Sequence, residues 1–197
     1  MNAELLTPRP ASSRSAGARL RPSRSAGDIV LRSAAPEEAT ALHDLIEAHL
    51  EEGRLLPRHP EELAVHAARF VVAVRRGRIV GCAELAPLSG RVAEVRSLVV
   101  DRRARSLGIG RLLVTGLHRR ARVAGFDQLC AFAHDAAFFA RMGFSIVPHT
   151  WVPEKIARDC RTCPQFRRCG QHALVLPLSD ARQPRVPSYV PLTALRG

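Results

Sequence analysis

The sequence contains a single lysine, Lys155. The other 29 of its 30 Lys and Arg residues are arginine. Aromatic residues are also scarce, with one Trp, one Tyr and seven Phe in 197 residues. No stretch approaches the roughly 18 consecutive apolar residues of a membrane helix, which predicts that this is not an integral membrane protein. Hydrophobic residues still make up 46% of the chain, enough for a core, so wholesale disorder is excluded.

The sequence also gives no sign of secretion. Five cysteines are an odd number, so they cannot all pair with one another, and residues 1–27 lack the apolar region of a secretory signal. A reducing, cytoplasmic location is therefore predicted. The Arg-, Ser- and Pro-rich composition of residues 1–27 also resembles a mitochondrial transit peptide, but a disordered extension is favoured.

The net charge of +12 is unevenly distributed. Residues 1–27 hold five Arg and one Glu, and residues 179–197 hold three Arg and one Asp, which leaves +6 for residues 28–178. We expect a disordered extension, one globular domain over 28–178 and a disordered tail. The domain should attract anionic ligands. The basic charge also allows a protein that binds nucleic acid and has no enzymatic activity. Aromatic residues are few and no nucleic-acid recognition motif is present, so no specific nucleic acid is expected as a partner.

Hydrophobic periodicity predicts a mixed α/β (α+β) domain. Helices are expected at 36–53, from 60 onward, at 108–125 and through 138–143. Strands are expected at 29–31, 70–74, 78–85, 92–100, 126–134, from 144 and at 173–178. Short turns join the three strands between residues 70 and 100, which predicts an antiparallel meander inside a mostly antiparallel sheet flanked by helices.

The most informative segment is the Arg-rich turn from Asp101 to Gly110. Gly108 and Gly110 stand at a predicted helix start, where bare backbone N–H groups and the helix dipole favour a phosphate. The turn is not a P-loop, because no Gly-Lys-Ser/Thr follows. It is not a dinucleotide fingerprint either, because Leu113 stands where the third glycine belongs.

This turn, Arg105-x-x-Gly108-x-Gly110, together with the run Phe138–Phe144, resembles the GNAT N-acetyltransferases. The resemblance implies the GNAT fold, splayed between the fourth and fifth strands, and acetyl-CoA as cosubstrate. Ser106 stands where many members carry glycine, and an ordinary glycine-rich loop is the alternative. The residues expected at acetyl-CoA are Leu98, Val99, Val100, Arg105, Ser106, Leu107, Gly108, Ile109, Gly110 and Arg111.

Four further segments, 55–58, 79–83, 94–100 and 160–166, resemble the short bacterial N-acetylglutamate synthases. This implies direct acetyl transfer to the α-amine of L-glutamate, in arginine biosynthesis. Two departures bear on the acceptor: Ala133-His134-Asp135 replaces a Thr-Tyr-Glu run, and the loop 86–91 is shortened. Another small amine or a protein N-terminus is therefore the alternative acceptor, and a monomer and a homodimer both stay open.

Glu94 is the candidate catalytic residue, because it stands inside a nearly apolar strand and an α-ammonium must lose a proton before it attacks. Arg96 falls on the same strand face, so a structural ion pair is an equal alternative. Arg96 and Arg58 are candidates for binding the substrate carboxylates, since a guanidinium matches a carboxylate bidentately. For Arg58 a solvated loop charge is the alternative. Backbone N–H groups near Leu98 should polarise the thioester carbonyl.

The general acid of many GNAT enzymes is a tyrosine, and here its position holds Phe139. The only tyrosine, Tyr189, lies in the predicted tail. His134 shares a predicted strand face with Cys130, which allows a substitute acid or a Cys–His nucleophile; a packed thiol beside an exposed histidine is favoured.

Several possible metal ligands lie close together in the segment 160–172, near the C-terminal end of the predicted domain. Cys160, Cys163, Cys169 and His172 could complete a tetrahedral structural zinc site. Three reduced thiols in a loop are the alternative, and it is slightly favoured.

Overall fold

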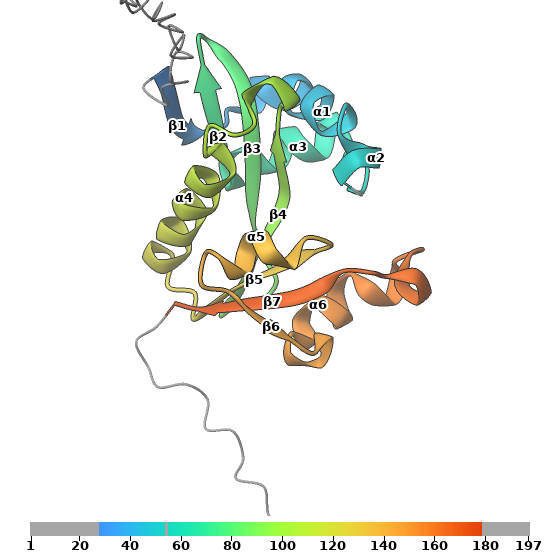
Figure 1. Cartoon of the computed structure of the whole chain (residues 1–197). Coiled ribbons are helices and arrows are strands. Elements are labelled where there is room, and N and C mark those ends of the chain that lie inside the picture. Colours follow the sequence, from blue (N-terminus) through green and yellow to red (C-terminus); the bar gives the residue numbers. More distant parts are fainter. Residues whose placement is uncertain (1–27, 54, 179–197) are drawn as a thin grey trace, which may run out of the picture.

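A computed structural model describes residues 28–53 and 55–178 (Figure 1). The extension and tail predicted at the two ends lie outside the described residues. The strands are β1 (Ile29–Ser33), β2 (Phe70–Arg75), β3 (Arg78–Pro87), β4 (Val92–Val100), β5 (Gln128–Ala133), β6 (Ser145–Val147) and β7 (His172–Pro177). The helices are α1 (Ala39–Glu47), α2 (Leu50–Gly53), α3 (Pro60–His66), α4 (Ile109–Val123), α5 (Ala136–Ala140) and α6 (Pro153–Arg158).

The strands form one seven-stranded sheet in the order β1-β2-β3-β4-β5-β7-β6. Strands β1 to β4 pair antiparallel, which confirms the predicted meander. Strands β4 and β5 run parallel, and their pairing extends only from Val92↔Gln128 to Val95↔Ala131. Because β4 continues to Val100, the two strands diverge at one end, and the sheet opens there (Figure 1).

The first predicted helix is divided into three parts. A 3-10 turn at Pro36–Glu38 precedes α1, and α2 follows after a break at Ala48 and His49. The ring Nδ1 of His49 bonds the carbonyl of Leu45 at 2.8 Å, which is the carbonyl that the His49 N–H would take in a continuous helix. That N–H instead donates to Ile46 at 3.0 Å, so the helix stops.

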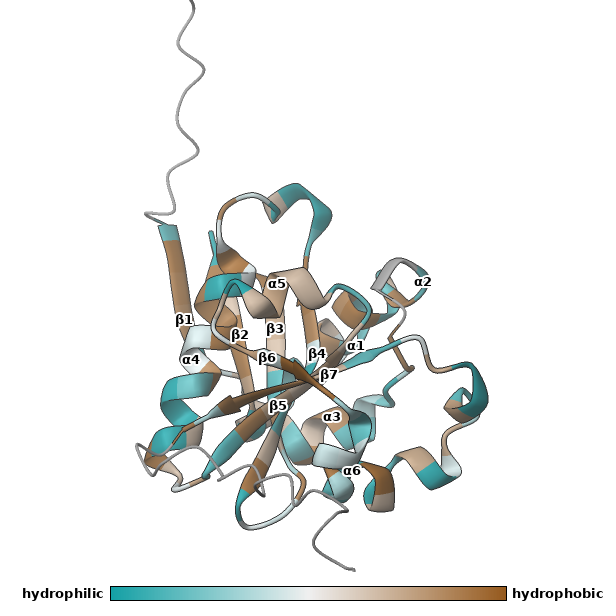
Figure 2. Cartoon of the chain, turned by 60° about the horizontal axis from the view of Figure 1, so that its bottom comes forward, coloured by the Kyte–Doolittle hydropathy of each residue, from teal (hydrophilic) through white to brown (hydrophobic). Residues whose placement is uncertain are grey.

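Both faces of the sheet are covered, as the alternation along β2 shows. Phe70 and Val72 pack in the cluster of α1 and α3, while Val71 and Ala73 pack in the cluster of α4. Hydrophobic residues are concentrated along the strands (Figure 2). Each fully buried large apolar side chain stabilises the fold by about 1.5–3 kcal/mol.

Helix α6 was not predicted. Its proline and glutamate in the first turn suit a helix start, but six residues are too few to show a helical period. It covers the same sheet face as α1 and α3, beside β5, where Val152 and Cys130 share a buried cluster. Within the described part of the chain, no helix has the length and apolarity needed to cross a bilayer.

Candidate active site

Strand β4 contains a bulge near the point where it diverges from β5. Glu84 pairs with Arg96 but Cys82 pairs with Val99, so β4 carries one more residue than β3 between these pairs. Ser97 adopts φ +50°, which produces the bulge. The alternation expected along the whole of β4 therefore ends at Arg96, and the backbone near Leu98 is turned out of the regular ladder.

The glycine turn lies where the sequence places it, at the N-terminus of α4. Gly108 is the N-cap residue at φ +75°, and the space where its Cβ would lie is empty within 4 Å. Ser106 also has positive φ, +65°. The 15 residues of α4 direct their dipole and the unpaired N–H groups of the first turn toward this exposed backbone. The turn is therefore built to receive an anion.

The predicted cofactor residues differ in what they can offer to a ligand. Leu107 and Ile109 are 7% and 1% exposed and pack in the core, so they can offer a ligand only their backbone. Arg105 and Arg111 are exposed, and Arg105 Nε donates to the carbonyl of Val100 at 3.2 Å. Val99 is buried against the α1 side of the sheet, and Leu98 lines the cavity described next.

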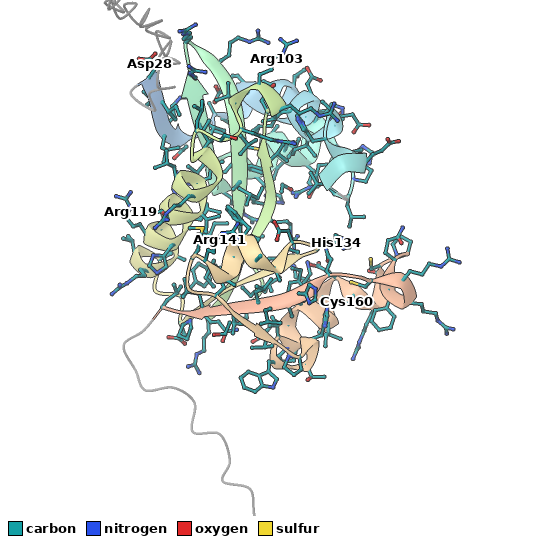
Figure 3. The ribbon with its side chains drawn as sticks, viewed as in Figure 1. Asp28, Arg103, Arg119, His134, Arg141 and Cys160 are labelled. Atoms are coloured by element: carbon teal, nitrogen blue, oxygen red, sulfur yellow. The ribbon has the colours of Figure 1, made fainter. Side chains whose placement is uncertain are left out.

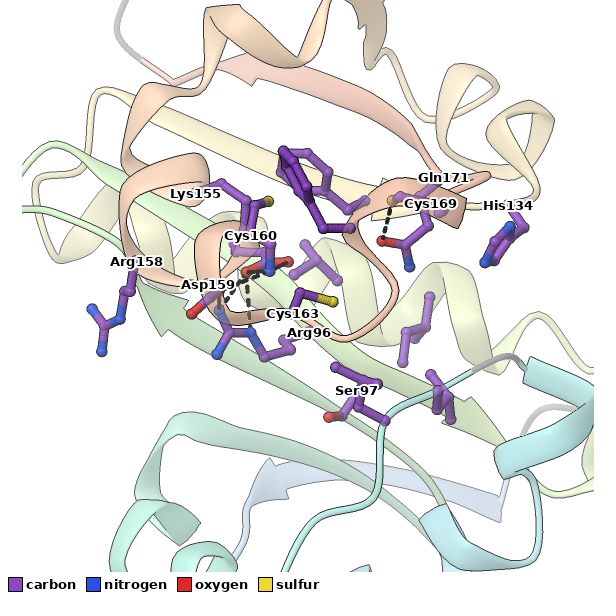
Figure 4. A pocket seen from close by; sticks show the side chains of 18 of the residues that line it. Arg96, Ser97, His134, Lys155, Arg158, Asp159, Cys160, Cys163, Cys169 and Gln171 are labelled. Atoms are coloured by element: carbon purple, nitrogen blue, oxygen red, sulfur yellow. Dashed lines mark hydrogen bonds and ion pairs between the residues drawn. The ribbon is translucent and has the colours of Figure 1, made fainter.

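A cavity of about 710 Å³ lies on the α6 side of the opening (Figure 4). The end of β4 forms its floor. The loop 55–58 and the segment 159–171, which joins α6 to β7, form its walls. The volume falls within the range of small-molecule sites. The cavity contains the predicted catalytic and substrate-binding residues, Glu94, Arg96 and Arg58.

Glu94 lies in an ion network at this floor. Its side chain is 4% exposed, and its Oε2 accepts hydrogen bonds from Arg96 Nη2 at 2.6 Å and Nε at 3.0 Å. The predicted neighbourhood of Glu94 and Arg96 is thus confirmed. Lys155 of α6 adds a second cation, with Nζ 2.8 Å from Oε1 and 2.9 Å from Oε2.

Asp159 completes the network from the end of α6. Its carboxylate accepts hydrogen bonds from Lys155 at 2.9 Å and from Arg96 at 2.5 Å. Burial alone would raise the pKa of Asp159, but the bond from Lys155 and the charge of Arg96 outweigh it and lower that pKa. The network balances two cations with two carboxylates, and it ties α6 to β4.

Arg58 is a buried cation, not a solvated loop charge. Its guanidinium pairs with Glu84 at 2.9 Å and with Glu62 at 2.8 Å, and Nη1 also donates to Ser97 Oγ at 3.1 Å. Burial disfavours its charged form, but the nearby Glu84 charge raises its pKa. Arg58 therefore fixes the bulge of β4 to the loop 55–58.

The aromatic helix α5 joins the glycine turn to the cavity. Asp135 caps it, since its Oδ1 accepts from the N–H of Ala137 at 3.0 Å. A Cβ built at Gly110 would lie 3.4 Å from the Phe138 ring, so this ring packs against the start of α4. Phe139 is 6% exposed and packs edge-on against Phe144. Neither ring carries a hydroxyl, so α5 supplies no side-chain acid.

Cys130 and His134 do not form a nucleophilic pair. Cys130 is fully buried in β5, and burial raises the pKa of its thiol far above its usual range. His134 follows the end of β5 and bonds the carbonyl of Gly170 through Nδ1 at 3.1 Å. The thiol is packed, as favoured, but His134 is half-buried rather than exposed and lies beyond the end of the strand expected to contain it (Figure 3).

The zinc site that the sequence allowed but did not favour is not formed by the described residues. Across the described residues, no three His, Cys, Asp or Glu side chains come together in a way that could hold a metal ion. Cys160, Cys163 and Cys169 line the cavity, but His172 does not, because it begins β7 and pairs with Ala133 there. All five cysteines are free thiols.

Three residues of the site, Lys155, Asp159 and Ser97, were not predicted from the sequence. The only usable signals were that Lys155 is the single lysine and that it lies four residues before Asp159, the spacing of a helical ion pair. Nothing in the alternating pattern of β4 marks Ser97 as the position of a bulge.

Comparisons with known proteins agree with this geometry. Residues 66–146 match the family model described as an acetyltransferase (GNAT) domain. A protein of Chlorobaculum tepidum, named an uncharacterized N-acetyltransferase, is 34% identical over 150 residues, which cover 76% of this chain and 97% of that protein. An amino-acid acetyltransferase of Shewanella oneidensis is 30% identical over 127 residues, which cover 64% of this chain and 28% of that protein.

Among solved structures, N-acetylglutamate synthase from Neisseria gonorrhoeae, complexed with coenzyme A and N-acetyl-glutamate, superposes with a TM-score of 0.69 at 27% identity. The match covers 77% of this chain and 35% of that one. This chain thus spans only about a third of the length of the named amino-acid acetyltransferase and synthase that it matches.

Proposed function

This chain belongs to the GNAT acetyltransferase family, and on that premise we propose that it transfers the acetyl group of acetyl-CoA directly to the α-amine of L-glutamate. The observation that carries the proposal is the cavity in which Glu94, Arg96 and Lys155 converge beside the opening of β4 and β5. The similarity to the gonococcal synthase, whose structure holds coenzyme A and N-acetyl-glutamate, supports glutamate as the acceptor.

Acetyl-CoA supplies the activated acyl group, and the residues of the glycine turn fit it. The backbone at Ser106, Gly108 and Gly110 would receive the pyrophosphate, with the exposed Arg105 and Arg111 providing positive charge at its edges. The bulge at Ser97 interrupts the ladder between β3 and β4, and we propose that it turns backbone N–H groups toward the opening. There they would hold the thioester carbonyl and stabilise the negative charge that develops on its oxygen.

The acceptor would enter from the cavity on the α6 side. Glu94 is proposed to take the proton from the α-ammonium, either directly or through a water, and so produce the free amine. Arg96 is the better candidate for a substrate carboxylate than Arg58. All three guanidinium nitrogens of Arg58 are used by Glu62, Glu84 and Ser97. The bonds of Arg96 to other described residues use Nε and Nη2 and leave Nη1.

The cavity favours a free amino acid over a protein N-terminus. The segment 159–171 covers one side of it, so an acceptor must be small enough to enter beside this wall. We further propose a cytoplasmic role in arginine biosynthesis, which the relation to amino-acid acetyltransferases supports. A protein N-terminus or another small amine remains the second candidate, because the run Ala133–Asp135 departs from the synthase pattern.

Arg96→Lys tests the acceptor site. Lysine keeps the positive charge beside Glu94 but loses the planar fork, so the KM for L-glutamate should rise about tenfold. The KM for acetyl-CoA should stay within about twofold, because the cofactor turn is separate. Steady-state kinetics with each substrate varied in turn measure both constants.

The matched control is Arg91→Lys. Arg91 lies just before the same strand, pairs with Asp127 and is 83% exposed, outside the cavity. Its kinetics should match the unmodified protein. An Arg96→Lys variant with an unchanged KM for glutamate would remove Arg96 from the acceptor site.

A further inference from the structure

Three thiols line the cavity wall and have no part in the proposed acetyl transfer. Cys160, Cys163 and Cys169 come from the segment that joins α6 to β7, and Figure 4 shows their sulfur atoms around the cavity. The other two cysteines, Cys82 and Cys130, are fully buried. The chain therefore separates three accessible thiols from two enclosed ones.

Cys160 and Cys163 are placed at the two ends of one tight turn. A 3-10 helix runs over Cys160–Thr162, and the N–H of Cys163 donates to the carbonyl of Cys160 at 3.2 Å. A turn closed by this bond keeps the Cα atoms of its first and fourth residues within about 7 Å. Disulfides span Cα separations of about 4.4–6.8 Å. The Cα separation within this turn is therefore compatible with a disulfide.

Cys169 is placed differently. It lies beyond a second turn, at the end of the 3-10 helix Phe166–Arg168, and its Sγ faces Gln171 Oε1 at 3.9 Å. No turn bond brings it to either of the other two cysteines in the described segment. Cys169 therefore serves as the matched control thiol, because it lies in the same cavity wall but is not joined to another cysteine by a closed turn.

The turn also carries a residue of the ion network. Asp159 directly precedes Cys160, and its carboxylate holds Lys155 and Arg96. Its backbone carbonyl accepts from Thr162 Oγ1 at 3.4 Å, inside the same turn. A bond between Cys160 and Cys163 would tighten this turn and displace the carboxylate that it positions.

We propose that Cys160 and Cys163 form a redox-responsive dithiol, whose oxidation by a low-molecular-weight disulfide changes the wall of the acceptor cavity and slows acetyl transfer. The effect on rate rests on the proposed function; the disulfide itself does not. The thiolate of one of the two cysteines attacks the oxidant disulfide and forms a mixed disulfide, releasing one small thiol. The other cysteine then loses its proton and attacks the protein sulfur of this mixed disulfide, releasing the second small thiol. Two protein thiols are oxidised and one small disulfide is reduced.

Both thiols are partly buried, so either can make the first attack. The second attack is intramolecular and favoured by proximity.

The test begins with the full chain incubated with oxidised glutathione, alkylated and mapped by peptide mass spectrometry. The expected product links Cys160 to Cys163 and leaves Cys82 and Cys130 as free thiols. A protein that forms no such link, or one that links Cys169 instead, overturns the proposal. This readout needs no substrate, so it stands even if glutamate is not the acceptor.

The second measurement is the acetyl-transfer rate before and after oxidation. The rate should fall about tenfold, since small displacements at a reacting site have large effects, and dithiothreitol should restore it. Cys163→Ser should abolish the response, and Cys169→Ser should retain it. A Cys163→Ser variant that loses activity equally on oxidation would assign the effect to another thiol. If the oxidised protein transfers acetyl groups at an unchanged rate, the disulfide has no influence on the cavity, and the proposal that oxidation slows acetyl transfer is contradicted.

Discussion

Glu94→Gln is expected to lower kcat about a hundredfold while leaving acetyl-CoA affinity unchanged, because glutamine keeps the shape of the side chain but cannot take the proton of the acceptor ammonium. Steady-state kinetics, with acetyl-CoA binding measured by calorimetry, give both results.

The variant also removes one of two carboxylates from a network with two cations. Breaking a buried pair costs about 3–5 kcal/mol of stability, because the partner charge stays buried and uncompensated. A fall in activity alone could therefore report a damaged fold. Lys155→Met removes the matching cation, since Lys155 contacts both oxygens of Glu94.

The double variant Glu94→Gln/Lys155→Met separates the two roles. If Glu94 takes the proton, the double variant should regain melting temperature but keep the low kcat. If the double variant recovers both the melting temperature and kcat, Glu94 has only the structural role of an ion-pair partner of Arg96.

Gly108→Val is expected to weaken acetyl-CoA binding tenfold or more, because a branched side chain would cover the N–H groups that receive the pyrophosphate, and hydrogen bonds to charged groups contribute about 1.5–3 kcal/mol each. Calorimetric titration with acetyl-CoA and with CoA measures the loss. The change should appear as a higher KM for acetyl-CoA, with the KM for glutamate affected little.

Gly125→Val is the matched control at the other end of α4. Gly125 has φ +80° against +75° at Gly108, and both positions have open space around a built Cβ. Each variant should lose about 1–2 kcal/mol of stability from the left-handed backbone. Only Gly108→Val should lose acetyl-CoA affinity. Equal affinities in the two folded variants would exclude the glycine turn as the cofactor site.

Local patterns in the sequence were enough to predict most of the sheet and the glycine turn. The alternation from Phe70 to Val100 predicts the meander, and Gly108 marks the start of α4, because both depend on neighbouring residues alone. The adjacency of Glu94 and Arg96 follows from the period of a strand in the same way.

The rest of the site depends on contacts between distant segments. Lys155 reaches Glu94 across 61 positions, and Arg58 reaches Ser97 across 39. No spacing rule predicts such pairs, and α6 is too short to show a period. The zinc site considered within 160–172, which was less favoured than three reduced thiols, is not formed by the described residues. Ligand spacing could not exclude it, because spacing does not show that His172 begins a strand.

The most direct test of acetyl transfer to glutamate is the identification of the product. The full chain is incubated with acetyl-CoA and an equimolar mixture of the free L-amino acids, and the products are separated and identified by mass spectrometry while CoA release is followed. The expected result is N-acetyl-L-glutamate as the main product, formed in step with CoA. Acetylation of other amino acids or of peptide N-termini, with glutamate left unmodified, would contradict it.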